Sequence, residues 1–179
     1  DHRGGGRSSG RETASRVAGG AIAQEILRAE GVSVLAYIVE LGGIEARVLD
    51  PEGAQARPFF SPDPEAPARF EERIREVKAQ GDSLGGVVEI QVLGLPPGIG
   101  EPVFDKLDAR LAYALMGVGA VKGVEIGAGT AAARLTGSRN NDPMTPEGFA
   151  SNNAGGILGG LSSGQPVVAR AFVKPIPSI

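Results

Sequence analysis

Residues 32–49 read VSVLAYIVELGGIEARVL. The first eight are mostly β-branched, aromatic or otherwise apolar, and residues 44–49 alternate between apolar and charged side chains, as in strands that have one buried face. Between the two stretches stands Glu40-Leu41-Gly42-Gly43, a short glycine-containing connection typical of antiparallel strand pairs. We therefore expect a β-hairpin that joins residues 32–39 to residues 44–49.

Apolar residues recur at helical spacing in three other parts of the chain. Ser9 and Glu12 stand in the S-x-x-E relation of a capping box, and Gly31 fits the left-handed residue that ends a helix. The expected helices run from this cap to Gly31, from Asp63-Pro64 to Gly81, and from Pro102 onward.

Further strands are expected at residues 86–93, 121–126, 130–136 and 167–175. In residues 86–93, Glu89 and Gln91 alternate with valine and isoleucine, which predicts one face toward water. Helices and adjacent strands occur without regular βαβ alternation. The sequence therefore predicts a single α+β domain over residues 1–179, a layered sandwich of helices and a mostly antiparallel sheet.

Composition narrows the functional classes. The 179 residues include 28 Gly and no Cys, 41% are hydrophobic, and the net charge is −3. A disulfide scaffold, a thiolate metal site and a strongly basic nucleic-acid binder are thus excluded, and the longest apolar run, residues 34–39, is too short to cross a membrane. We expect a cytoplasmic protein without metal ligands. Because the chain starts at Asp1 and closes at Ile179 without a tapering tail, we also expect an internal fragment.

The most distinctive local feature is GGGRSSGR at residues 4–11, immediately before the first helix. Free backbone N–H groups, the helix dipole and two arginines together favour a phosphate-bearing ligand. The alternative is a flexible loop with an ordinary cap. His2 and Lys174 are ambiguous: a lone terminal histidine is usually exposed, and Lys174 suits either an edge strand or an anion.

Three other patterns stand out in the sequence. The G-x-S-x-G matches at residues 6–10 and 160–164 have the wrong context for a hydrolase, because the single histidine precedes both serines. The G-x-G-x-x-A match at residues 127–132 is better explained by a tight hairpin turn than by a dinucleotide site. The polar stretch at residues 137–153 predicts a long functional or mobile loop.

Several blocks together resemble the chorismate synthase family, in the family's order and over essentially the whole chain. These blocks are RGGGRSSGRETASRVAGGAIA, GDSLGG, GEPVFDKLDARLAYALMGVGAVKGVEIG, GSRNND, NNAGGILGGLSSGQP and KPIPS. The resemblance covers about the middle half of such an enzyme and contains no catalytic residue of the family. It implies a homotetrameric lyase that converts 5-enolpyruvylshikimate 3-phosphate to chorismate and phosphate by 1,4-anti elimination with reduced FMN. It leaves open whether NADPH reduces the flavin on the enzyme.

The resemblance also implies site residues. Flavin contacts fall on Arg7, Ser8, Ser9, Gly119, Ala120, Gly159, Lys174, Pro175, Ile176, Pro177 and Ser178, and substrate contacts on Gly10 and Arg11. Three positions depart from the family pattern: Gly10 replaces Ala, Gly119 replaces Asn, and Pro177 is unusual. The alternative function from another class is a non-catalytic anion- or nucleotide-binding module.

Overall fold

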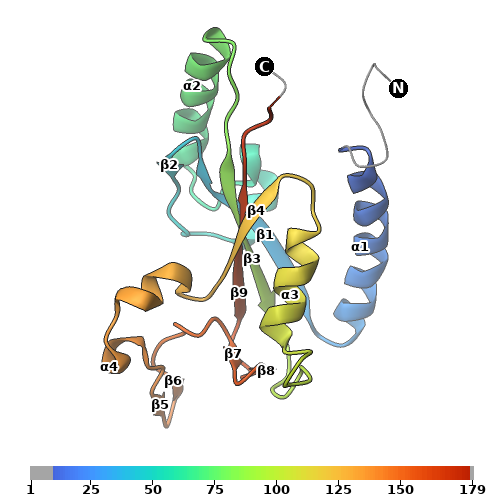
Figure 1. Ribbon diagram of the computed structural model, residues 1–179, viewed down its shortest axis with the longest axis vertical. Coiled ribbons are helices and arrows are strands. Elements are labelled where there is room, and N and C mark those ends of the chain that lie inside the picture. Colours follow the sequence, from blue (N-terminus) through green and yellow to red (C-terminus); the bar gives the residue numbers. More distant parts are fainter. Residues whose placement is uncertain (1–9, 178–179) are drawn as a thin grey trace.

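A five-stranded antiparallel sheet organises the computed structural model, which describes residues 10–177 (Figure 1). The strand order is β2-β1-β3-β9-β4. The strands of this sheet are β1 (Ser33–Leu41), β2 (Ile44–Glu45), β3 (Gly86–Leu93), β4 (Val121–Ile126) and β9 (Val167–Val173). Strand β9, the last of these five in the sequence, therefore lies between β3 and β4. This arrangement confirms the predicted α+β class with a mostly antiparallel sheet.

The predicted hairpin forms, but its second strand is shorter than expected. Gly42 and Gly43 have φ values of 56° and 82°, so the two-residue turn uses the conformation that glycine adopts most easily. Strand β2 ends at Glu45 rather than at residue 49. The backbone N–H of Arg47 donates instead to the Asp63 carboxylate at 3.1 Å, which draws the chain away from β1.

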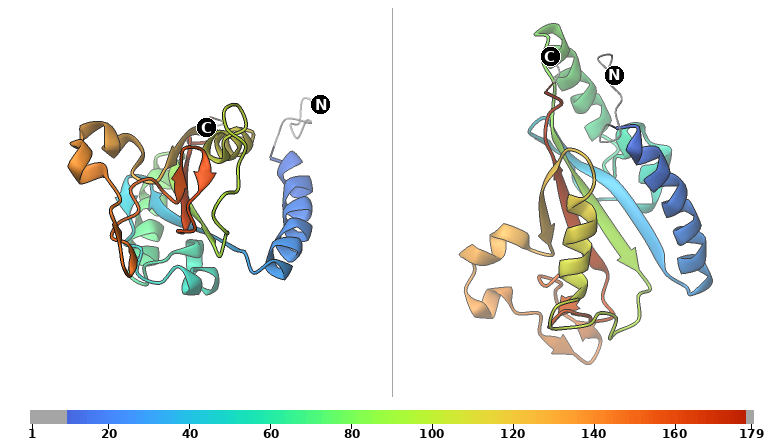
Figure 2. Two further views of the ribbon diagram at one scale, coloured as in Figure 1. Left: turned by 90° about the horizontal axis from the view of Figure 1, so that it is seen from below. Right: turned by 45° about the vertical axis from the view of Figure 1, so that its right-hand side comes forward.

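Helices occupy both faces of the sheet (Figure 2). The α-helices are α1 (Glu12–Ala29), α2 (Ala66–Ala79), α3 (Leu107–Met116) and α4 (Gly137–Asn140), and the 3-10 helices are η1 (Glu52–Ala56), η2 (Pro58–Phe60) and η3 (Gly129–Arg134). Helix α3 lies on one face, whereas η1 and η2 lie against the other. Within residues 10–177, no helix combines the length and apolar character needed to cross a bilayer.

Two predicted elements are wrong in type or position. The third helix begins at Leu107 instead of Pro102, because Glu101 and Asp105 exchange backbone hydrogen bonds of 2.9 Å and close a small loop before it. Residues 130–136 form no strand, and no hairpin turn precedes them. The Glu125 carboxylate accepts the backbone N–H and the hydroxyl of Thr130, which winds the chain into η3.

The polar stretch at residues 137–153 is more ordered than the predicted loop. It contains α4 and a small hairpin, and a second small hairpin follows it. These hairpins consist of β5 (Met144–Thr145) with β6 (Gly148–Phe149), and of β7 (Ile157–Leu158) with β8 (Leu161–Ser162). Both lie at the end of the sheet where β9 begins (Figure 1).

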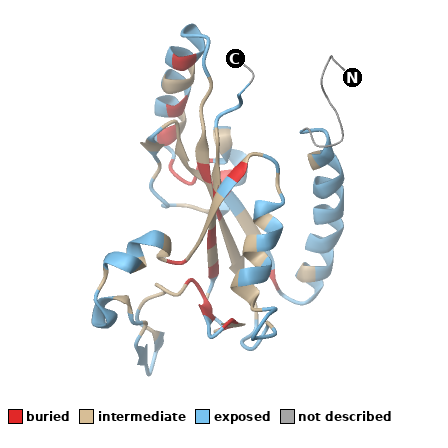
Figure 3. Ribbon diagram, viewed as in Figure 1, coloured by how far each residue is buried: buried red, intermediate tan, exposed pale blue. Residues whose placement is uncertain are grey.

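Burial is uneven across the molecule (Figure 3). Small apolar residues of β9, such as Ala169 and Ala171, are buried, as is Phe70 of α2. Helix α1 has no buried residue, and Ile22 on it is 68% exposed. The predicted apolar stripe of α1 is therefore left uncovered by the rest of the described chain.

A row of polar side chains crosses four strands on one face of the sheet. Tyr37, Glu89, Arg170 and Glu125 occupy directly paired positions on β1, β3, β9 and β4. The Tyr37 hydroxyl donates to Glu89 at 2.8 Å, and the Arg170 guanidinium lies 2.8 Å from Glu89 and 3.8 Å from Glu125. Glu89 is buried, so the predicted water-facing side of β3 is wrong: these partners allow its carboxylate to be covered. Burial, and secondly Glu89, raise the pKa of Tyr37.

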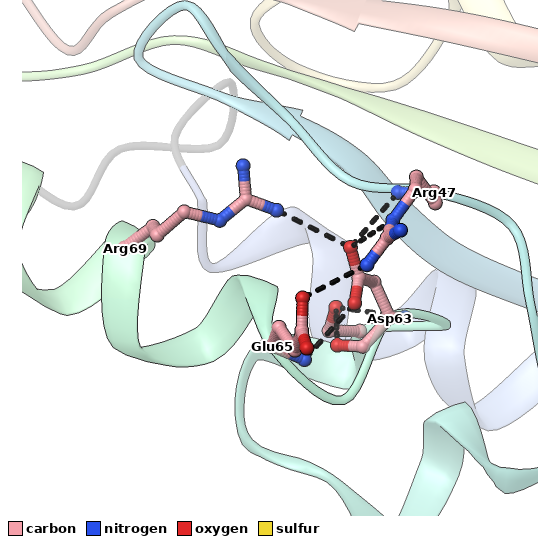
Figure 4. Close-up of polar contacts among 5 residues, drawn as sticks. Arg47, Asp63, Glu65 and Arg69 are labelled. Carbon is pink, nitrogen blue, oxygen red and sulfur yellow. Dashed lines mark hydrogen bonds and ion pairs between the residues drawn. The ribbon is translucent and has the colours of Figure 1, made fainter.

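A second buried carboxylate joins the hairpin to α2 (Figure 4). Asp63 is fully buried and accepts the backbone N–H groups of Glu65 at 2.9 Å and Arg47 at 3.1 Å. The Arg69 guanidinium lies 3.2 Å from it. The Glu65 N–H, followed by the Arg47 N–H and the two guanidinium charges, lowers the pKa of Asp63 despite burial. Helix α2 begins at Ala66 rather than at the predicted Asp63-Pro64, and the residue before it, Glu65, makes no side-chain cap hydrogen bond. Asp63 instead anchors the chain after β2.

The polar row can be tested by removing its cation. We expect Arg170→Met to lower the free energy of unfolding by about 2–3 kcal/mol, because it leaves the buried Glu89 carboxylate without its ion pair. The control is Arg75→Met, which breaks an exposed pair with Glu71 and should cost less than about 0.5 kcal/mol. Urea unfolding measures both variants, and equal losses would contradict a structural role of the row.

Candidate functional site

The expected anion site at the start of α1 is described only in part. Arg7, Ser8 and Ser9 lie outside the described residues, whereas Gly10 and Arg11 precede the helix. The helix begins at Glu12, and the residue before it, Arg11, is helical in conformation and makes no side-chain cap hydrogen bond. The Glu12 carboxylate accepts a hydrogen bond from Arg16 at 2.9 Å, one turn further on. Ser9, the other half of the predicted capping box, lies outside the described residues, so the capping box stays a prediction.

Two other predicted segments meet at one end of the sheet. Gly119 and Ala120 form the loop between α3 and β4, and the Lys174 N–H donates to the Ala120 carbonyl at 3.0 Å. Ala120 has a φ of 70°, a strained value for alanine that turns the chain sharply into β4. This contact joins positions 120 and 174, which are far apart in the sequence.

The first turns of α1 approach the same end. The Arg16 guanidinium lies 3.7 Å from the point that a Cβ atom would occupy at Gly117, the residue directly after α3. Figure 1 shows the start of α1, the α3–β4 loop and the chain after β9 at this common end of the molecule. Three segments that the sequence analysis assigned to one ligand site thus share one end of the fold.

The chain after β9 also packs on the loop before β3. The Ser83 hydroxyl donates to the Ile176 carbonyl at 2.6 Å. A Cβ atom at Gly85 would lie 2.6 Å from the Val173 carbonyl and 3.1 Å from Pro175, so only glycine permits this approach. The GDSLGG block therefore holds the chain at Pro175 and Ile176, between Lys174 and Pro177, while Ser178 lies outside the described residues.

Gly159 does not join this group. It is an exposed turn residue between β7 and β8, with a φ of 60°. The next residue, Gly160, accepts the N–H of Leu107 at 2.9 Å, so the turn lies at the start of α3, whereas Ala120 follows the end of that helix. Within one chain, the length of β9, about 20 Å, separates Gly159 from Lys174.

Asp142 forms a polar junction that sequence reasoning missed. Its carboxylate accepts the Ser151 hydroxyl at 2.6 Å and the backbone N–H groups of Asn153 and Ala154 at 2.7 and 2.8 Å. Burial opposes ionisation, but these hydrogen bonds together hold the pKa of Asp142 below its usual value. The Asn153 carbonyl in turn accepts the Ala128 N–H. The signal in the sequence was the pairing of two polar blocks, GSRNND and NNAGG, which the junction joins.

Ser162, the serine of the second G-x-S-x-G match, has a structural role. It is buried, donates to the Pro96 carbonyl at 2.6 Å and accepts the Ile99 N–H at 2.8 Å. These contacts bind β8 to the loop before α3. A hydroxyl engaged in this way is no exposed nucleophile, and Ser8 of the first match lies outside the described residues.

Comparison with known proteins places these features in a family. A model of the family "Chorismate synthase" matches residues 1–179. The chain belongs to the chorismate synthase family. The blocks quoted in the sequence analysis, which the structure brings together in pairs, are thus parts of one family framework, and the resemblance is confirmed.

Individual chorismate synthases agree closely with this chain. That of Maridesulfovibrio salexigens is 68% identical over all 179 residues, which make up 51% of its length, and that of Oleidesulfovibrio alaskensis is 67% identical over 50% of its length. A crystal structure of a chorismate synthase matches with a TM-score of 0.89 and 38% identity, over 96% of this chain and 57% of that one. The chain therefore spans about half the length of the curated relatives it matches.

The Asp142 junction predicts a pH-dependent stability. Because the folded-state pKa of Asp142 lies below the unfolded value of about 3.9, its contribution is complete above that value and disappears as the pH falls through the folded-state pKa. We expect Asp142→Asn to lower the free energy of unfolding by about 1–2 kcal/mol at pH 7, and by less at pH 3. Urea titrations at both pH values measure this, and a loss independent of pH would contradict the role of the ionised carboxylate.

Proposed function

We propose that this chain is the central part of an enzyme that converts 5-enolpyruvylshikimate 3-phosphate to chorismate and phosphate by 1,4-anti elimination with reduced FMN. The observation that carries the proposal is the hydrogen bond between the Lys174 N–H and the Ala120 carbonyl, which joins two segments to which the family resemblance assigns flavin contacts. The family match over residues 1–179 supports it. The reaction belongs to the shikimate pathway of aromatic amino acid biosynthesis, and the enzyme class is a carbon–oxygen lyase acting on phosphates.

The residues at this end of the sheet fit an anionic flavin cofactor. Among residues 10–177, no carboxylate lies within 4.0 Å of the Lys174 ammonium, so its charge is not neutralised by the protein there. Pro175 to Pro177 are exposed, and their backbone is fixed by Ser83 and by the prolines themselves. Lys174 would hold the flavin phosphate or its reduced ring, and Ala120 would contribute backbone contacts. When bound, reduced FMN supplies electron density for the departure of phosphate.

The chain's own role in the reaction is binding and orientation. Elimination removes a proton and a phosphate from a substrate that carries several negative charges. Arg11, at the first turn of α1, suits a planar carboxylate or a phosphate through its guanidinium fork. Lys174, at the end of β9, offers a compact positive charge. The family's catalytic histidines have no counterpart at His2, so we propose that proton transfer depends on parts of the protein beyond residues 1–179.

We further propose that the enzyme acts in the cytoplasm as a homotetramer, as its family does. The uncovered apolar stripe of α1, in which Val17, Ile22 and Ile26 are each more than 60% exposed, supports an assembly larger than this chain. The alternative, a non-catalytic anion- or nucleotide-binding module, would use the same cationic end of the sheet without turnover.

A chimaera tests the proposed activity. Residues 1–179 replace the matched 51% of the Maridesulfovibrio salexigens enzyme, with which they share 68% identity. We expect this chimaera to form chorismate anaerobically with reduced FMN, as followed by ultraviolet absorbance, and residues 1–179 alone to form none. A folded chimaera that binds substrate but does not turn over would favour the module, and turnover by residues 1–179 alone would contradict the proposed division of roles.

Two variants of the chimaera test the proposed residue roles. We expect Arg11→Ala to weaken substrate binding more than FMN binding, and Lys174→Ala to do the reverse. Each loses a hydrogen bond to a charged group, which corresponds to about a ten- to hundred-fold change in affinity. Titration with FMN, and then with substrate in the presence of FMN, measures both. Equal losses in both titrations for both variants would show that these residues only maintain the fold.

A further inference from the structure

An open cavity of about 330 Å³ lies at the end of the sheet that carries Lys174. Val87 of β3 and Phe172 of β9 form apolar parts of its lining. Two glycine pairs, Gly42-Gly43 in the hairpin turn and Gly85-Gly86 at the start of β3, also line it, and their lack of side chains lets a ligand approach the backbone. Its charged lining residues are Glu40, Lys122 and Lys174, of net charge +1.

Two irregularities in the sheet shape this cavity. Glu40, Val87, Phe172 and Gly123 are directly paired across four strands. The register shifts on both sides of this row, once in β1 between Ile38 and Glu40, and once in β4 between Val121 and Gly123. Lys122 is the extra residue of the second bulge. Bulges redirect side chains and are frequent next to functional sites. The bulge in β4 therefore takes Lys122 out of the regular alternation of that strand.

The two lysines of the cavity, Lys122 and Lys174, lie next to one pair of residues on β4 and β9. Val121 is paired with Val173, and each lysine directly follows one of these two residues. In the described part of the chain, neither ammonium group lies within 4.0 Å of a carboxylate, whereas Lys106 pairs with Asp108 at 3.5 Å. Because the strands are antiparallel, Lys122 and Lys174 lie diagonally across this pair, and both line the cavity. The cavity therefore presents two positive charges at its β4–β9 wall that the described residues do not neutralise.

We propose that Lys122 and Lys174 together bind the phosphate group of a phosphomonoester in this cavity, which makes Lys122 a ligand-binding residue. A phosphomonoester carries a charge of about −1.5 to −2 at neutral pH. It therefore matches the charge of two lysines better than a ligand with a single carboxylate would. Each ammonium group has three donors for the phosphate oxygens. The inference rests on the proposed function, because both FMN and the proposed substrate are phosphomonoesters.

The competing explanation is that Lys122 protects an edge. Strand β4 is an edge strand of its sheet, and lysines on edge strands discourage pairing with other chains. That role requires no ligand. It predicts that replacing Lys122 changes the tendency to aggregate but leaves phosphate binding unchanged, so the two explanations differ in a measurable quantity.

The experiment measures equilibrium binding to the chimaera without turnover, so that a failure of the proposed activity does not affect the result. Lys122→Gln and Lys122→Met are compared with Lys78→Gln, which removes an exposed lysine on the last turn of α2 that does not line the cavity. The probes are FMN, riboflavin, 5-enolpyruvylshikimate 3-phosphate and inorganic phosphate. Circular dichroism and urea unfolding establish that each variant is folded.

We expect both Lys122 variants to bind inorganic phosphate and one of the two phosphomonoesters about ten-fold more weakly, with Lys78→Gln unchanged. Weaker FMN binding with unchanged riboflavin binding would identify the flavin phosphate as the ligand group, and weaker substrate binding alone would identify the substrate phosphate. Unchanged binding of all four probes would overturn the proposal in favour of edge protection. Equal losses for FMN and riboflavin would also overturn it, because they would show a distorted cavity rather than a lost phosphate contact.

Discussion

The polar row from Tyr37 to Glu125 is the constraint on which the arrangement of the strands depends. A buried carboxylate must be paired, and Glu89 obtains its partners from strands on both sides: the Tyr37 hydroxyl from β1 and the Arg170 guanidinium from β9. Placing any other strand beside β3 would leave that charge without its cation. The row therefore specifies which strand lies between β3 and β4, a choice that general hydrophobic burial would leave open.

The position of β9 in turn determines the site. Because β9 runs antiparallel to both neighbours, its last residue lies beside the first residue of β4 and the first residue of β3. The chain leaves β9 next to Ala120 on one side and Gly85 on the other, and Lys174 is fixed between them. A carboxylate buried in the middle of the sheet thus positions a cation at its end, without contacting any ligand itself.

Much of this structure could be predicted from the sequence where the signal is local. The Gly42-Gly43 hairpin, helix α2 with its Glu71–Arg75 pair, and the strand at residues 86–93 follow from periodicity and turn chemistry. The family resemblance was recognisable because its blocks are long. Predictions failed where a distant side chain outweighed the local preference. The strand at residues 44–49 ends early because the Arg47 N–H donates to Asp63. Glu89 is buried rather than exposed because Tyr37 and Arg170 bind its carboxylate. The resemblance assigned residues 120 and 174 to one site. Their contact arises because β9 ends beside the start of β4, a strand order that no local pattern in the sequence indicates.

The strand order also has a consequence for how this chain acquires its structure during synthesis. Strand β4 is paired only with β9 within the sheet, yet β9 follows it in the sequence only after the α4 region and both small hairpins. As the chain emerges, β1 and β3 can pair early, while residues 121–126 wait for a partner still to be translated. Such non-local pairing slows folding and leaves an unpaired edge exposed in the meantime. The side of the sheet that carries Lys174 thus cannot form on the ribosome until β9 has been translated.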